Sequence, residues 1–171
     1  TTNPSSWSAS SMQNGIWVLQ NYVGNIGTSS ENSSRTLTHE VGHWLNLSHT
    51  WGPNNNPGSA GCNGSDQVQD TPATQGSTSC ILTANTCSTD NAYWGFDQID
   101  NVENYMDYSY CSKMFTQGQV DRMRTAITQS SSGRANVISA ANLASVGASG
   151  NPTLCTAKFS TPRTVICSGE S

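Results

Sequence analysis

The sequence predicts an α+β domain, and three observations lead to this fold class. Residues 15–24 place β-branched and aromatic side chains between two glycines, which is typical of a strand. A helix is indicated from Arg35 onward by apolar residues at helical spacing, namely Leu37, Val41, Trp44 and Leu45. Residues 52–100 are instead rich in Gly, Pro, Asn, Asp and Ser, so we expect an irregular segment there.

Two helices frame this irregular segment. Ser33 or Ser34 can cap the first helix, whose apolar stripe we expect to face the core. Thr116 and Gln119 fit a capping box at the start of the second helix. Its expected core-facing stripe consists of Val120, Met123 and Ile127. We expect the domain to span residues 1–148, with 149–171 as a linker or the start of a further C-terminal module.

Composition excludes several classes of partner. The net charge is −4, which argues against nucleic acid or an anionic membrane as partner because both require a basic surface. No apolar run is long enough to span a bilayer. The chain begins with polar residues and no signal peptide, so we interpret it as a processed or trimmed product.

The six cysteines predict disulfides and an oxidising compartment, since their number is even and the chain is poor in lysine. A zinc–thiolate site is the alternative, but no C-x2-C pair occurs. Six cysteines allow fifteen pairings, and the residues alone do not choose among them.

All three histidines lie within residues 39–49. His39 and His43 are four residues apart, so they share one face of a helix and can bind one Zn²⁺. Glu40 completes an H-E-x-x-H motif, in which the carboxylate acts as general base on a water at the metal.

His49 can join these two histidines only if the chain turns sharply after the helix. Asn46 stands at the required place, and asparagine tolerates the left-handed conformation that ends helices. This geometry gives three nitrogen ligands and one open position, which is the catalytic form of a zinc site.

The segment "HEVGHWLNLSHTWG" (39–52) resembles the extended motif of the metzincin metallopeptidases, with Asn46 in place of the usual glycine. Together with "DTPA" (70–73) and "NYMDYS" (104–109), it is similar to the pappalysin and cytophagalysin branch, which includes ulilysin-like enzymes. The resemblance covers roughly residues 15–148.

The resemblance implies a secreted zinc endopeptidase that acts on protein or peptide substrates. Met106 would belong to the Met-turn beneath the zinc, and Tyr108 would approach the zinc or steady the tetrahedral oxyanion. The strand at 15–24 would be a sheet edge along the substrate cleft. The wall of the specificity pocket would come from the segment after Met106, with the candidates Asp107, Ser109, Tyr110 and Lys113.

The resemblance also implies how the irregular segment is held. It suggests the disulfides Cys62–Cys87 and Cys80–Cys111, with Cys155–Cys167 closing a separate loop. A Ca²⁺ ion is expected near this segment, because calcium accepts many oxygen ligands from irregular loops. The candidate calcium ligands are Asp66, Val68 through its carbonyl, Asp70 and Thr71.

Only 38 residues precede His39, so we expect an incomplete N-terminal sheet. The missing part of a longer precursor is a possible partner of this chain. Two alternatives to a zinc endopeptidase stay open. One is a zinc-containing binding module without catalysis, and the other is a zinc hydrolase of a non-peptide substrate.

Overall fold

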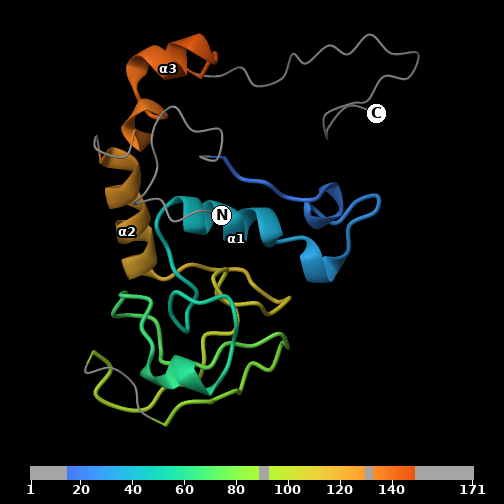
Figure 1. Ribbon diagram of the computed structural model, residues 1–171, viewed down its shortest axis with the longest axis vertical. Coiled ribbons are helices and arrows are strands. Elements are labelled where there is room, and N and C mark those ends of the chain that lie inside the picture. Colours follow the sequence, from blue (N-terminus) through green and yellow to red (C-terminus); the bar gives the residue numbers. More distant parts are fainter. Residues whose placement is uncertain (1–14, 89–92, 130–132, 149–171) are drawn as a thin grey trace, which may run out of the picture. The chain divides into compact units, whose positions relative to one another are not determined.

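The computed structural model describes residues 15–88, 93–129 and 133–148 (Figure 1). The chain divides into two compact units, residues 1–135 and 136–171. Residues 149–171 lie outside the described residues, so the division expected after residue 148 stays a prediction. The helices among the described residues of the first unit are α1 (Thr36–Trp44), α2 (Gln117–Thr128) and the 3-10 turns η2 (Gln20–Tyr22), η3 (Glu31–Ser33) and η4 (Ser59–Asn63). The second unit contains α3 (Ala140–Ser145), and η6 (Arg134–Asn136) crosses the boundary.

The strand predicted at residues 15–24 is wrong. This segment contains η2, and most of its apolar side chains are exposed, with Trp17 80% accessible. The described residues form no sheet, only the isolated bridges His49–Gly52 and Asn104–Met114. A strand requires a neighbour to satisfy its backbone, and none of the described segments pairs with residues 15–24. The described residues therefore do not form the expected sheet edge along a substrate cleft.

Helix α1 begins differently from the prediction. Arg35 is its N-cap residue and makes no side-chain cap, whereas Ser33 forms a capping box with Ser30 around η3. The predicted core-facing stripe is also wrong in part, because Leu37 and Val41 are exposed. The buried residues of α1 are His39 and Gly42. The helix thus directs its histidine face, rather than its aliphatic face, into the molecule.

Helix α2 begins where the sequence predicts. Thr116 is its N-cap, and the Thr116 hydroxyl accepts a hydrogen bond from the Gln119 backbone N–H at 3.2 Å. The Gln119 side-chain oxygen accepts from the Thr116 backbone N–H at 2.9 Å, which completes the capping box. Gln119 is fully buried and also exchanges hydrogen bonds with the Asn104 amide, so the helix start is fixed to the loop before Met106.

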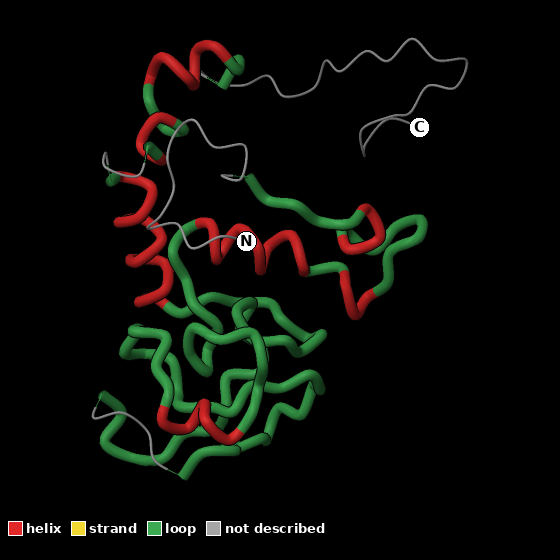
Figure 2. Tube along the Cα trace, in the orientation of Figure 1, coloured by secondary structure: helices red, strands yellow, loops and turns green. Residues whose placement is uncertain are grey.

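Loops and turns make up nearly all of the segment between α1 and α2 (Figure 2). Disulfides join Cys62 to Cys87 and Cys80 to Cys111, the two pairs that the resemblance implies for this segment. This segment has no β-ladder among its described residues, and a buried carboxylate instead accepts hydrogen bonds from its backbone. Asp100 accepts from both the backbone N–H and the hydroxyl of Thr86. Cys155 and Cys167 lie outside the described residues.

Candidate metal centre

The helix α1 ends in a turn that redirects the chain toward its own histidines. Asn46 has a φ of 72°, in the left-handed region that the sequence predicts for it. The Leu47 N–H donates to the Gly42 carbonyl at 3.0 Å, and the Asn46 N–H donates to the His43 carbonyl at 2.9 Å. These two bonds form a Schellman motif, which satisfies the last carbonyls of the helix. Arg122 of α2 donates to the Asn46 carbonyl at 2.7 Å and holds the turn in place.

The turn brings His49 to His39 and His43. The Nε2 atom of His43 lies 3.0 Å from that of His39 and 3.1 Å from that of His49. Within the described residues, these histidines form the group of His, Cys, Asp or Glu side chains whose ligand atoms all lie within 4.8 Å of one another. The three side chains converge on one point from both sides of the Asn46 turn.

Each histidine binds a backbone carbonyl through its other ring nitrogen. The Nδ1 atoms of His39, His43 and His49 lie 2.6, 2.8 and 2.9 Å from the carbonyl oxygens of Tyr105, Leu47 and Asn54. Because a carbonyl only accepts, each Nδ1 carries the proton and each Nε2 presents a bare lone pair. Three lone pairs that face one another at about 3 Å cannot bond among themselves, so this arrangement fits a cation.

Burial keeps the histidines neutral. Desolvation lowers the pKa of His39 and His43, and lowers that of His49 to about 3 with a further contribution from the two neighbouring imidazoles. A neutral imidazole is the form that binds a metal. The cluster is therefore in its ligating state throughout the physiological range of pH.

Met106 supports the cluster from below. Its side chain is fully buried, and a Cβ atom built on Gly42 would collide with its sulfur. A side chain at position 42 would thus force Met106 to shift, so Gly42 lets α1 lie close to the loop that carries Met106. The Met106 carbonyl accepts from the Thr50 backbone N–H at 3.3 Å, which links this loop to the segment after His49.

A cavity of about 350 Å³ opens over the histidines. Glu40, Tyr108, Asp107 and Ser109 line it together with the three histidines. Tyr108 is half exposed, and its ring lies 5.5 Å from that of His39 and 4.9 Å from that of His49. Desolvation and the nearby charge of Glu40 raise the pKa of Tyr108, so its phenol stays protonated. Both residues expected to act in catalysis therefore lie at this cavity.

The structure divides the four candidates for the specificity pocket. Tyr110 and Lys113 line a different cavity from the one over the histidines. Both carboxylate oxygens of Asp107 are engaged, because they accept from the Thr50 hydroxyl and from the backbone N–H groups of Ser77, Tyr108 and Ser109. Desolvation raises the pKa of Asp107 to about 6, against the effect of these donors. The hydrogen bonds of Asp107 thus stabilise the wall of the cavity.

Three of the four residues named for calcium lie together. The Thr71 hydroxyl oxygen lies 2.9 and 2.8 Å from the two carboxylate oxygens of Asp66, and 2.8 Å from the carbonyl of Val68. The Val68 backbone N–H also donates to Asp66 at 2.9 Å, but one hydroxyl proton still faces three acceptor atoms, so oxygen lone pairs outnumber donors here. Asp66 is buried, and desolvation raises its pKa to about 6.

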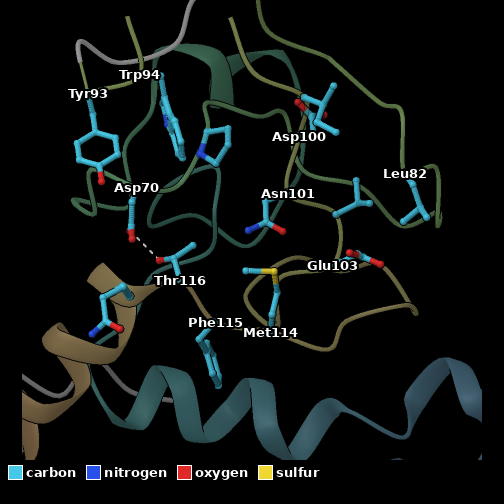
Figure 3. Close-up of a pocket in the computed structure, with 14 residues that line it drawn as sticks. Asp70, Leu82, Tyr93, Trp94, Asp100, Asn101, Glu103, Met114, Phe115 and Thr116 are labelled. Carbon is cyan, nitrogen blue, oxygen red and sulfur yellow. Dashed lines mark hydrogen bonds between the residues drawn. The ribbon is translucent and has the colours of Figure 1, made fainter. Parts of the chain in front are cut away.

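Asp70 does not join this group. Its carboxylate accepts from the Thr116 hydroxyl at 2.7 Å (Figure 3). It also accepts from the Gly118 backbone N–H at 2.9 Å. A carboxylate in the first turn of a helix is favoured by the unpaired N–H groups there. Asp70 also borders a cavity of about 470 Å³ beside Trp94 and Met114, and none of the three histidines lines that cavity.

Sequence reasoning missed Trp51. Its ring is 1% exposed and stacks on His49 with a centroid distance of 4.5 Å and an interplanar angle of 2°. The available signal was the position of a large aromatic residue two places after the third histidine. That spacing alone does not show that the two rings are parallel.

The site is a three-histidine metal centre. Two of its histidines lie on one helix, and the left-handed residue at the helix end brings the third one to them. Comparison with known proteins gives the family. Residues 3–128 match the family Peptidase M43, described as pregnancy-associated plasma protein-A. The chain therefore belongs to this family, the pappalysin branch of the metzincins.

Similar proteins agree with this assignment. An extracellular metalloprotease of Colletotrichum graminicola is 36% identical over 132 residues, which cover 75% of this chain and 42% of that protein. One from Verticillium alfalfae is 37% identical over 131 residues, covering 73% and 43%. A promirolysin mutant of Tannerella forsythia superposes with a TM-score of 0.51 and 36% identity, covering 67% of this chain and 36% of that one. This chain thus spans about two fifths of the length of the curated relatives that it matches.

Proposed function

We propose that this protein is a secreted zinc-dependent endopeptidase in which His39, His43 and His49 hold the metal. The observation that carries this proposal is the convergence of three bare Nε2 lone pairs, each fixed by a carbonyl at Nδ1. Three imidazole nitrogens with an open cavity beside them suit a catalytic zinc ion. Secretion is supported by the relatives, which are named extracellular metalloproteases. No helix among the described residues is long and apolar enough to cross a membrane.

When bound, zinc supplies a Lewis acid that activates water and polarises a carbonyl group. Glu40 serves as general base, taking the proton of the attacking water and passing it to the leaving amine. Its position supports this role, because Glu40 lies on α1 between two ligands and borders the cavity. Its charge also reaches these neighbours, because it partly opposes the lowering of the pKa of His39 and His43 and adds to the raised pKa of Tyr108.

Tyr108 is proposed to donate a hydrogen bond to the oxyanion that develops during peptide hydrolysis. The proposal is supported by its phenol, which keeps its proton because the pKa is raised, and by its place at the same cavity as Glu40. A donor aimed at developing charge contributes more in the transition state than in the ground state. Tyr108 would therefore affect turnover more than substrate binding.

The test measures zinc content and peptide cleavage in the same preparation. A Glu40→Gln variant should keep one zinc per chain and lose about 10²–10⁴-fold in the rate of cleavage of a mixed peptide library. Glu31→Gln, which removes an exposed carboxylate from η3, should leave both unchanged and serves as the matched control. The cleavage sites, mapped by mass spectrometry, would also show the residue preference.

The same measurement distinguishes the alternatives. A protein that holds zinc but cleaves no peptide would favour a binding module, and cleavage of an ester or amide panel alone would favour a non-peptide hydrolase. A protein without bound zinc would overturn the assignment of the three histidines.

We also propose a calcium site at Asp66, Val68 and Thr71. The support is the excess of oxygen acceptors over donors among these three residues and the cavity of about 290 Å³ that they line. A cation there would offset the cost of burying the ionised Asp66 carboxylate. Because one neighbour is a pro-form, we further propose that this chain is part of a longer precursor.

A further inference from the structure

The third histidine differs from the first two in how it is supported. His39 and His43 belong to α1, so the helix backbone fixes their positions. His49 follows the Asn46 turn and belongs to no helix, and its isolated bridge spans only His49 and Gly52. A metal centre needs all three ligands held within a fraction of an ångström, so His49 requires support from elsewhere.

Trp51 provides a flat and rigid support for His49. The two rings lie parallel, with an interplanar angle of 2° and centroids 4.5 Å apart. One acceptor also serves both rings, because the Asn54 carbonyl oxygen lies 2.9 Å from His49 Nδ1 and 3.1 Å from Trp51 Nε1. The position of the indole therefore fixes both the plane of the imidazole and the acceptor that determines its tautomer.

The backbone around Trp51 is built to hold the indole. A Cβ atom on Gly76 would collide with the six-membered part of the ring, and one on Gly61 would lie 2.8 Å from the Trp51 Cβ. Both positions belong to the irregular segment closed by Cys62–Cys87 and Cys80–Cys111. The disulfide-bonded segment thus packs closely against the Trp51 side chain.

Tyr108 completes the aromatic group. Its ring meets that of Trp51 edge-on, with centroids 4.8 Å apart and an interplanar angle of 78°. It meets His49 in the same way, at 4.9 Å and 79°. Trp51 does not line the cavity over the histidines, so it acts on that site only through these two neighbours.

We propose that Trp51 is a positioning residue of the metal centre. Its indole holds His49 in the orientation that zinc requires and connects His49 to the disulfide-bonded segment. This inference rests on the proposed function, since it assumes that His49 is a zinc ligand. The inference predicts that zinc binding weakens step by step in a series of Trp51 variants. Trp51→Phe keeps a flat ring but loses the bond to Asn54, whereas Trp51→Leu loses both.

The experiment measures the zinc dissociation constant of each purified variant by competition with a chromophoric chelator. We expect zinc binding to weaken by about 10-fold in Trp51→Phe and by up to about 100-fold in Trp51→Leu, the range seen when a ligand's supporting partner is removed. Trp17→Leu is the control because Trp17 is 80% exposed, and it should bind zinc like the parent. At saturating zinc, the KM for peptides should match that of the parent, since Trp51 does not touch the cavity.

Thermal unfolding of the metal-free proteins separates positioning from simple packing. If Trp51→Phe and Trp51→Leu lose thermal stability but bind zinc as tightly as the parent, Trp51 is only a core residue and the inference is wrong. If the parent itself binds no zinc, the proposed function fails first and this inference falls with it.

A measurement on the unsubstituted protein keeps the test decisive if both variants fail to fold. The chain has five tryptophans, and each can be labelled as 5-fluorotryptophan. We expect zinc to shift the Trp51 fluorine resonance, assigned by comparison with Trp51→Phe, more than those of the other described tryptophans, because the Trp51 indole stacks on a ligand. A spectrum in which zinc moves no resonance would overturn the inference.

Discussion

The histidine cluster and two of the buried aspartates, Asp66 and Asp107, respond to burial in opposite ways. Desolvation favours the neutral form of both kinds of group, so it lowers the pKa of the histidines and raises that of the aspartates to about 6. For an imidazole the neutral form is the ligand, so burial prepares the site for zinc. For a carboxylate the ionised form is disfavoured, so burial creates a need for donors or a cation.

The two aspartates meet this need differently. Asp107 has four donors, three of them backbone N–H groups and one the Thr50 hydroxyl. Asp66 accepts from the Val68 N–H and from Thr71, but the Thr71 hydroxyl also faces the Val68 carbonyl. Asp107 is therefore held by four donors, whereas Asp66 has fewer donors together with the charge of Arg122, and the proposed calcium ion would add a second positive charge there. Substitutions at the two positions should separate these explanations.

The largest effect is expected at Asp107. Asp107→Ala leaves four donors without their acceptor, at a cost of about 1–3 kcal/mol for each one that stays buried, so the total should exceed about 3 kcal/mol. Asp107→Asn keeps one acceptor oxygen and the shape of the side chain, so it should cost much less. Urea unfolding of the two variants checks this difference. Equal losses of unfolding free energy in the two variants would show that the oxygen acceptors of Asp107 do not stabilise the fold.

The second prediction concerns pH and calcium at Asp66. The folded-state pKa is raised from 3.8 to about 6, so the native state binds more protons than the unfolded state between these values, and this group's contribution to stability is lost as pH rises through that window. Asp66→Asn removes the effect and should gain stability relative to the parent between pH 4 and 7, on the order of 2 kcal/mol. Unfolding curves at each pH, without metal, measure the difference.

Calcium should reverse this dependence. If the ion binds ionised Asp66, added Ca²⁺ will stabilise the parent more at pH 7 than at pH 4 and will leave Asp66→Asn unaffected. Equal stabilisation of both proteins would place calcium elsewhere. The histidines supply an internal contrast, since their lowered pKa values make metal-free stability rise with pH below their ordinary value of 6.5.

What the sequence could predict depends on how local the cause is. The spacing of His39 and His43, the left-handed Asn46 and the Thr116–Gln119 capping box involve residues within a few positions of one another. The carbonyls that fix the histidine tautomers come from Tyr105 and Asn54, one of them 66 residues away from its partner. Their choice depends on the folded chain, so the motif indicates a metal centre without showing what orients it.

The wrong predictions share the same cause. A strand at residues 15–24 needs a partner, and the exposed stripe of Leu37 and Val41 needs a covering surface. Neither is supplied by the described residues. Asp70, expected beside Asp66 as a calcium ligand, instead accepts hydrogen bonds at the start of α2, and its role as a ligand stays a prediction.

The smallest effect tests the local part of the argument. Asn46→Ala forces an ordinary Cβ residue into a φ of 72°, which should cost about 1–2 kcal/mol and loosen the return of the chain to His49. Asn46→Gly adopts this conformation without strain, so stability and zinc affinity should stay close to those of the parent. Unfolding and zinc titration of the pair measure both quantities. If glycine were as harmful as alanine, the asparagine side chain rather than its backbone conformation would be what the turn requires, and the family's usual glycine at this position would not be its equivalent.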